Sequence, residues 1–281
     1  MPQVSLVVCV YQQGDLLERL LRNSHHWCDD IVIVHDGPDT TDVSQVAARH
    51  AARFFERPRC FTHEPQWPFS WEACRNDWIL LFDADEFPSV ELVEWLKQFQ
   101  RGPEPAPDVS GFTCIWPLWD GRRAVTSGWP TGRIFMIDRR KVRYFGMGEN
   151  RPEPEGHFQD IPLVLHHQPI RKSFGVGNVL FRGQAYRWRS AIAEALMGKP
   201  TDLPCWRWIS PEWPDFWRQL IAHPLRHSVS SLLRFPFRQL RSMRTANQRP
   251  LVSACLNPAV HHCLLGIQVF IEKLRRGFQA R

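Results

Sequence analysis

The stretch Trp78-Ile-Leu-Leu-Phe-Asp83-Ala-Asp85-Glu86 decides the fold of this chain. An apolar run typical of a buried strand is followed by two carboxylates at a spacing of i, i+2. Side chains alternate along a strand, so we expect Asp83 and Asp85 to point the same way at its end. Two carboxylates directed at one point repel each other unless a positive charge lies between them. Because Mg²⁺ binds one or two protein carboxylates and completes its shell with substrate phosphates, the pair predicts a metal site for a phosphorylated ligand.

Strands and helices alternate along the first part of the chain. The expected strands are 4–10, 31–34 and 78–82, and the expected helices are 15–23, 41–55 and 90–99. This alternation predicts an α/β domain with a mainly parallel sheet flanked by helices. Ligands bind at the carboxyl ends of the strands in such sheets. Three candidate site segments follow expected strands, namely 11–14, 35–37 and 83–85.

The basic charge of the chain is concentrated in its C-terminal part. Residues 216–281 hold 11 Lys and Arg against one Glu, a net charge of +10, while the whole chain carries +6 and residues 1–215 therefore −4. A basic segment of this kind predicts contact with an anionic partner, such as a membrane surface or nucleic acid. We expect residues 1–200 to form one domain and residues 201–281 a basic, Trp-rich helical extension.

The extension carries two amphipathic patterns. Leu233, Phe237 and Leu240 recur at helical spacing beside a row of arginines, and a second apolar stripe follows between 260 and 274. Polar residues within 251–271 argue against a membrane-spanning helix. We expect the extension to lie on an anionic membrane surface, with packing of its helices on the first domain as the equally weighted alternative.

Cysteine usage bears on the compartment. The eight cysteines form no CxxC pair and no regular framework, and the N-terminus enters a strand without a basic region or a cleavage site. A reduced, cytosolic protein is therefore expected.

The order of these segments carries a resemblance. A strand ending at Tyr11, a second ending at Asp36-Gly-Pro-Asp-Thr-Thr-Asp42 and the stretch 78–86 resemble a family 2 glycosyltransferase of the GT-A fold. The likeness covers about residues 3–180 and is closest to the bacterial branch that adds sugars to lipopolysaccharide core or other surface glycans. It implies a Rossmann-like GT-A sheet with a nucleotide-binding part, 1–100, an acceptor-side part, 101–200, and a C-terminal amphipathic helical extension.

The resemblance also implies roles for residues. The nucleotide-sugar would be bound by Val10, Tyr11, Asp36, Asp83 and Arg133, and Mg²⁺ or Mn²⁺ by Asp83, Asp85 and His166. Strand alternation allows only one of the neighbours His166 and His167 to face the site, and the register favours His166. The alternatives are a solvated turn for Asp83 and Asp85 and an Asx-turn for Asp36.

An inverting transferase needs a base to accept the proton of the acceptor hydroxyl. Glu149 is the candidate, Asp120 is the reserve, and a water-facing loop carboxylate is the alternative for Glu149. The segment 128–130 resembles the acceptor side of the family, and Arg171 and Lys172 are candidates for holding the diphosphate, with solvation as the alternative.

One segment departs from the family. Many members carry an Ala-Arg-Asn helix a turn or more before the aspartates, whereas Cys74-Arg75-Asn76 stands directly before Asp77 here. Either that helix is shortened or Arg75 has another role.

These observations predict a metal-dependent glycosyltransferase. It would transfer a sugar from a nucleotide-sugar to a lipid-linked or surface-glycan acceptor, with inversion, at the inner face of the cytoplasmic membrane. A nucleotidyltransferase of related fold is one alternative, but the segment 11–15 lacks the Gly-rich basic loop of that class. A non-enzymatic nucleic-acid-binding protein is the other; no RNA-binding motif is visible, so no nucleic acid is expected.

Overall fold

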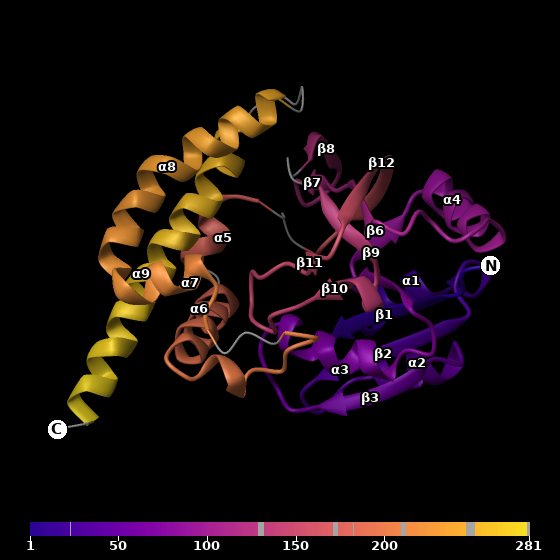
Figure 1. The fold of residues 1–281 in the computed structure, drawn as a ribbon, viewed down its shortest axis with the longest axis horizontal. Helices are drawn as coiled ribbons and strands as arrows, with labels where there is room; N and C mark the ends of the chain where they lie inside the picture. The colour runs from indigo at the N-terminus through magenta and orange to yellow at the C-terminus, as the bar shows by residue number, and fades with distance from the viewer. Residues whose placement is uncertain are drawn as a thin grey trace. The chain divides into compact units, whose positions relative to one another are not determined.

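A computed structural model describes residues 1–22, 24–128, 132–170, 174–181, 183–208, 212–245 and 251–279. The chain forms two compact units (Figure 1). The first comprises Met1–Ser173 and Pro204–Trp208, and the second comprises Phe174–Leu203 and Ile209–Arg281. The helices that follow residue 173 belong to the second unit.

A large mixed sheet forms the centre of the first unit, as the alternation of strands and helices predicted. Its strands are β1 (Val4–Val10), β2 (Asp30–Asp36), β3 (Arg53–Arg57), β4 (Trp78–Phe82), β5 (Glu86–Pro88), β6 (Val109–Ile115), β9 (Arg133–Asp138) and β12 (His157–His167). Their order is β3-β2-β1-β4-β9-β6-β12-β5. Strands β3, β2, β1 and β4 are mutually parallel, whereas β9 runs antiparallel between β4 and β6. The carboxyl ends of β1, β2 and β4 therefore meet at one edge of the sheet.

Both faces of the sheet are covered, because apolar side chains occupy both registers of its strands. On β4, Trp78, Leu80 and Phe82 belong to one buried cluster, and Ile79 and Leu81 belong to the other. The first cluster is completed by α1 (Gly14–Leu21), α2 (Val43–Arg49) and α4 (Val90–Arg101), and the second by α3 (Trp67–Ala73). Strand alternation assigns Asp83 to the same side as Leu81, the side covered by α3.

The predicted helix over 41–55 is too long. Helix α2 ends at Arg49, and Phe54 and Phe55 lie in β3, the edge strand that pairs with β2. The apolar residues of this segment change from helical to strand spacing. Pairing with β2 favours a strand over a helix at Phe54 and Phe55, because it buries one face of each phenylalanine.

Smaller elements complete the first unit. Strands β7 (Pro117–Trp119) and β8 (Ala124–Gly128) form a hairpin, and β10 (Val142–Arg143) pairs with β11 (Glu153–Pro154). Short 3₁₀ turns span Ser24–His26, Glu64–Gln66 and Arg139–Lys141. The turn at Glu64–Gln66 leads directly into α3, whose start carries Pro68, a residue well suited to the first turn of a helix.

The second unit is helical. It comprises α5 (Val176–Phe181), α6 (Gly183–Leu196), the 3₁₀ turn Pro200–Asp202, α7 (Asp215–Ala222), α8 (Pro224–Thr245) and α9 (Val252–Gln279). Helix α8 continues through Pro236, and Ser228 on α8 donates a hydrogen bond to the Cys263 carbonyl of α9. In the described part of the chain, only Val252–Gly277 is long and apolar enough to cross a membrane, with a mean hydropathy of 1.4 and 44% of that window buried within the protein.

Candidate active site

The three predicted segments lie together at the carboxyl edge of the sheet. Val10 at the end of β1 is in register with His35 near the end of β2, and Val8 is in register with Phe82 at the end of β4. The Tyr11 ring lies 5.8 Å from the His35 ring, and the Arg59 guanidinium stacks 3.1 Å above Tyr11. The parallel strands explain this convergence, since neighbouring strands deliver their following residues to one edge.

Asp36 is a buried carboxylate with protein partners. It accepts hydrogen bonds from the backbone N–H groups of Cys60 (2.7 Å) and Phe61 (3.0 Å) and from Nε2 of Gln66 (2.8 Å). Arg59 donates to the Asp36 carbonyl oxygen at 2.8 Å. Asp36 therefore fixes the loop that leads from β3 toward α3, and this loop stands beside Tyr11.

Asp83 shares a buried charge cluster with Glu86 and Arg133. Arg133 Nη2 lies 3.5 Å from Asp83 Oδ2, and Arg133 Nε donates to Glu86 Oε1 at 3.0 Å. Glu86 is fully buried and also accepts the Asp83 backbone N–H at 2.9 Å. Burial raises the pKa of Glu86 despite the neighbouring guanidinium. The predicted binding residues Asp83 and Arg133 are thus in contact, across the antiparallel pair β4–β9.

His63 joins this cluster from the loop before α3. Its Nδ1 lies 3.8 Å from Asp83 Oδ1, and its Nε2 lies 3.8 Å from Glu64 Oε1. Burial alone would lower the pKa of His63, but the carboxylates of Glu64 and Asp83 raise it. Burial alone would likewise raise the pKa of Asp83, but the positive charges around it, of His63 first and then of Arg133, lower it.

His63 and Glu64 were not predicted from the sequence. They lie in a segment without periodicity, just before the first turn of α3. One sequence signal could have indicated them. A histidine and a glutamate stand side by side directly before a helix start that contains proline, and this helix start holds both side chains near the sheet edge.

Asp85 lies beside His167. Asp85 Oδ2 is 3.5 Å from His167 Nε2, and the His167 ring stacks on Trp116 with a centroid distance of 4.2 Å. The backbone N–H of Gln168 donates to the Asp85 carbonyl at 2.8 Å, which ties the end of β12 to this turn. One of the two neighbouring imidazoles faces Asp85, as strand alternation predicted, but it is His167 and not the favoured His166. His166 is in register with Phe87 of β5.

Glu149 lines a cavity of about 160 Å³ together with Arg133, Arg151 and His63. Its backbone has a φ of +62°, and its N–H donates to Glu64 Oε1 at 3.1 Å. The reserve candidate Asp120 lies in the β7–β8 turn, where its carboxylate accepts the backbone N–H groups of Arg122 and Arg123. Of the two candidates, only Glu149 lines this cavity among the described residues.

Asp85 and His167 offer the donor atoms for the predicted metal. The described residues contain no group of three or more His, Cys, Asp or Glu side chains gathered as a metal site. The 3.5 Å between Asp85 Oδ2 and His167 Nε2 is, however, close to the separation of about 3 Å expected for two neighbouring ligands at about 2.1 Å from one Mg²⁺. One carboxylate and one imidazole fit a cation that takes its remaining ligands from a diphosphate and water.

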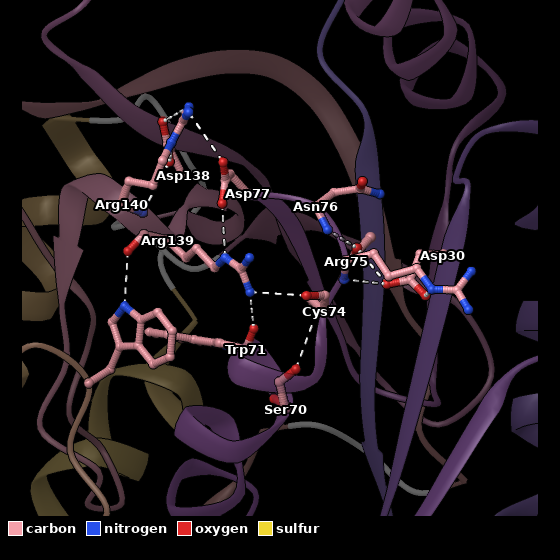
Figure 2. A network of polar contacts seen from close by, with 12 residues as sticks. Asp30, Ser70, Trp71, Cys74, Arg75, Asn76, Asp77, Asp138, Arg139 and Arg140 are labelled. Carbon is pink, nitrogen blue, oxygen red and sulfur yellow. Dashed lines mark hydrogen bonds and ion pairs between the residues drawn. The ribbon is translucent and has the colours of Figure 1, made fainter.

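The segment Cys74-Arg75-Asn76 lies at the opposite end of β4 (Figure 2). A seven-residue helix, α3, precedes it, and the backbone N–H of Arg75 donates to Asp30 at 2.9 Å. A short helix therefore stands before this segment, and Arg75 lies at the amino end of β4, away from the carboxyl edge of the sheet. Trp129, Pro130, Arg171 and Lys172 lie outside the described residues.

A family model matches the part of the chain that carries these strands. The model described as "Glycosyl transferase family 2" matches residues 5–148, just over half of the chain. The chain belongs to this family. Within the family 2 domain, the match includes β1 to β9 with Asp36, Asp83, Asp85 and Arg133, and it ends immediately before Glu149. No curated protein is significantly similar to the chain.

Solved structures are similar to this chain at low identity. A mannosyltransferase from Pyrobaculum calidifontis in complex with GDP-Man and Mn²⁺ is 15% identical over 97% of this chain and 87% of that protein, with a TM-score of 0.45. Residues 1–349 of S. aureus TarS in complex with UDP are 12% identical over 98% and 92%, with a TM-score of 0.39. Glucosyl-3-phosphoglycerate synthase from Mycobacterium tuberculosis is 15% identical over 41% of this chain and only 44% of its own length, with a TM-score of 0.34.

Proposed function

We propose that the chain transfers a sugar from a nucleotide-sugar to a hydroxyl of a lipid-linked or surface-glycan acceptor, with Mg²⁺ or Mn²⁺ as cofactor. The observation that carries the proposal is the pair Asp85 and His167, spaced as two ligands of one cation, beside the cluster of Asp83 and Arg133. A family 2 domain spans the strands that deliver these side chains. Family membership favours glycosyl transfer over nucleotidyl transfer or nucleic-acid binding.

The nucleotide-sugar would lie along the carboxyl edge of the sheet. Val10, Tyr11 and Asp36 end the strands at one side of this edge, and Asp83 ends β4 at its centre. The bound metal would neutralise the charge that develops on the leaving nucleoside diphosphate. Asp85 and His167 are the residues that would hold it. Arg133 keeps its charge because Glu86 and Asp83 raise its pKa against the effect of burial, so it can add a fixed positive charge beside the diphosphate.

Glu149 is the proposed base of an inverting transfer. A base must reach the acceptor hydroxyl from the side opposite the leaving group. Glu149 lines the cavity that also contains Arg133, a neighbour of Asp83, so an acceptor hydroxyl in this cavity could meet both the base and the donor. Conversion of Glu149 to Gln should remove transfer while leaving nucleotide binding unchanged.

The membrane role is assigned to one face of α8. Leu225, Val229, Leu232, Leu233 and Phe237 are exposed at spacings of one helical face. Exposed arginines, including Arg234 and Arg238, run along one side of this apolar face. Such a helix lies at a lipid interface with its apolar face inserted and its arginines near anionic headgroups. We therefore propose a cytoplasmic enzyme held peripherally on the inner face of the cytoplasmic membrane.

The membrane proposal is tested by sedimentation with phosphatidylglycerol and phosphatidylcholine vesicles. The wild-type protein should sediment with the anionic vesicles only, and Phe237→Asp should weaken this binding. Val90→Asp is the matched control, because Val90 is equally exposed but lies on α4 of the first unit. Equal sedimentation of the wild-type protein and Phe237→Asp would exclude this face of α8.

The transfer proposal is tested by a thermal-shift screen of nucleotide-sugars with Mn²⁺. A ligand that binds only the folded protein raises its melting temperature. We expect one nucleotide to give a shift that requires Mn²⁺ and that disappears in Asp85→Ala. The absence of any shift with uridine, guanosine, cytidine and deoxythymidine nucleotide-sugars would contradict the proposal.

A further inference from the structure

Glu64 is a buried carboxylate that the proposed reaction does not yet use. Its side chain is only 6% exposed, yet it lines the same cavity as Glu149. Its Oε2 atom is buried and has no hydrogen-bond partner within the part of the chain that the structure describes. A buried acceptor without a partner is costly, so such an atom at a cavity wall points to a donor that arrives with a ligand.

The other oxygen of Glu64 has a partner. Oε1 accepts the backbone N–H of Glu149 at 3.1 Å. Glu149 has a φ of +62°, in the left-handed region that is unfavourable for a residue with a side chain. The hydrogen bond from Glu149 to Glu64 helps to hold this turn, and it thereby fixes the direction in which the Glu149 carboxylate leaves the backbone.

The remaining cavity wall suits a sugar. Trp67 supplies an aromatic surface, and Asn150 and Arg151 add polar groups. Pockets that combine an aromatic wall with a few directed polar groups are typical of small-molecule sites. A carboxylate oxygen accepts hydrogen bonds only, and the hydroxyl groups of a sugar can donate them. The imidazole of His63, at 3.8 Å from Oε1, lies beyond hydrogen-bond distance of the carboxylate and leaves this need unmet.

We propose that Glu64 binds a sugar hydroxyl through Oε2 while Oε1 holds the Glu149 turn. The inference rests on the proposed glycosyl transfer, and it adds a substrate contact to that reaction. The hydroxyl belongs either to the sugar of the nucleotide-sugar or to the acceptor sugar. Both sources offer a sugar hydroxyl that donates a hydrogen bond. Measuring the binding of the nucleotide-sugar and of the acceptor sugar separately distinguishes them.

The experiment uses the full-length protein with Mn²⁺. Calorimetric titrations measure the affinity for UDP-glucose and GDP-mannose, for the bare nucleotides UDP and GDP, and for methyl β-glucoside and methyl α-mannoside added to the nucleotide complex. Glu64→Gln is compared with the wild type. Its amide oxygen can still accept the Glu149 N–H, whereas an NH₂ group, which only donates, replaces the second oxygen. Glu56→Gln is the matched control, since Glu56 also accepts a backbone N–H, that of Asp39 at 2.9 Å, but lies outside the cavity.

Glu64→Gln should weaken the binding of a sugar ligand by about 10- to 100-fold, the usual worth of a hydrogen bond to a charged group. The loss should fall on the nucleotide-sugar if the donor supplies the hydroxyl, or on the methyl glycoside if the acceptor does, and bare nucleotide should bind as before. Glu64→Ala should in addition lower kcat, because the Glu149 turn loses its acceptor. Melting temperatures of all variants identify any that fail to fold.

The outcomes separate the inference from the proposed function. Unchanged affinity of Glu64→Gln for both kinds of sugar ligand overturns the role of Glu64 while leaving glycosyl transfer intact. Equal loss of bare nucleotide and sugar ligand also overturns it, because Glu64 would then be only structural. If the wild-type protein binds no nucleotide with Mn²⁺, the proposed function fails and the role of Glu64 fails with it.

Discussion

The two ends of strand β4 carry two polar clusters of opposite character. At the amino end, Asp138 accepts Arg140 at 2.8 Å and Asp30 accepts Arg53 at 2.7 Å. Figure 2 shows Arg139 directed at Asp77 and at the Trp71 carbonyl. The Arg139 guanidinium lies 3.1 Å from the Asp77 carboxylate and 2.6 Å from the Trp71 carbonyl oxygen. The carboxylates here meet their partners at ordinary hydrogen-bond distances.

The carboxyl end of the same strand is open. Arg133 donates to Glu86 at 3.0 Å, but the ion pairs of Asp83 are long, with 3.5 Å to Arg133 and 3.8 Å to His63. One oxygen of Glu64 has no partner among the described residues, and a cavity adjoins the cluster. Closed networks hold a fold together, whereas charges that are gathered but incompletely paired are arranged for a ligand. This contrast favours the carboxyl end of β4 as the functional end proposed here.

The largest effect is expected at the open end. Asp85→Ala should lower sugar transfer by roughly 100-fold or more, because a bound metal supplies several kcal/mol of charge stabilisation. The melting temperature should be unchanged, or slightly raised by the loss of a repelling carboxylate. Initial rates of nucleotide release, measured next to a melting curve, test this. An active Asp85→Ala protein would show that the metal is not held at Asp85.

Substitutions at the amino end of β4 should change the stability of the protein instead of its activity. Asp138 is fully buried and accepts three hydrogen bonds from Arg140. Asp138→Ala should therefore reduce the free energy of unfolding by about 2–3 kcal/mol, through loss of a cap and of charge-assisted hydrogen bonds. Guanidinium unfolding monitored by fluorescence measures the loss. Stability within about 0.5 kcal/mol of the wild type, the usual range for a surface substitution, would remove the distinction between the two ends.

The two neighbouring histidines sharpen the assignment at the open end. His167→Ala should weaken Mn²⁺-dependent nucleotide binding about tenfold or more, because metal-site substitutions commonly cost that much in affinity. His166→Ala is the matched control and should bind normally, since His166 is in register with Phe87 and not beside Asp85. Titration of Mn²⁺ at fixed nucleotide compares the variants. A loss in His166→Ala alone would restore the original register prediction.

The smallest effect is expected for Asp77→Asn. Asp77 is 39% exposed and pairs with Arg139 and Arg140. Exposed ion pairs contribute about 0–1 kcal/mol, so the free energy of unfolding should fall by no more than that. Nucleotide binding should be unchanged, because Asp77 lies at the amino end of β4 and Asp83 lies at its carboxyl end. Impaired binding in Asp77→Asn would mean that the two ends of β4 are coupled.

The sequence allowed the fold and the edge of the site to be predicted. Hydrophobic runs identified β1, β2 and β4, and their parallel order brought Tyr11, Asp36 and Asp83 to one edge, as observed. These features depend on periodicity and on rules of sheet connection, which a sequence expresses directly. The metal, the acceptor and the roles of the named residues remain predictions.

Other features depend on contacts between distant segments. The choice between His166 and His167 follows from the pairing of β12 with β5, and no local pattern encodes that register. Glu64 meets the Glu149 turn across 85 positions of sequence, and both lie in segments without periodicity. The helix α3 was not predicted; it ends at Ala73, and Cys74-Arg75-Asn76 connects it to β4.

The central claim is that the carboxyl end of β4 binds a metal and a nucleotide while its amino end only stabilises the fold. The most direct measurement is calorimetric binding of UDP and GDP, with and without Mn²⁺, to the wild-type protein, Asp85→Ala and Asp77→Asn. One nucleotide should bind the wild type and Asp77→Asn equally and only with Mn²⁺, and it should not bind Asp85→Ala. Binding that is independent of Mn²⁺, or equal in Asp85→Ala and the wild type, would contradict the account.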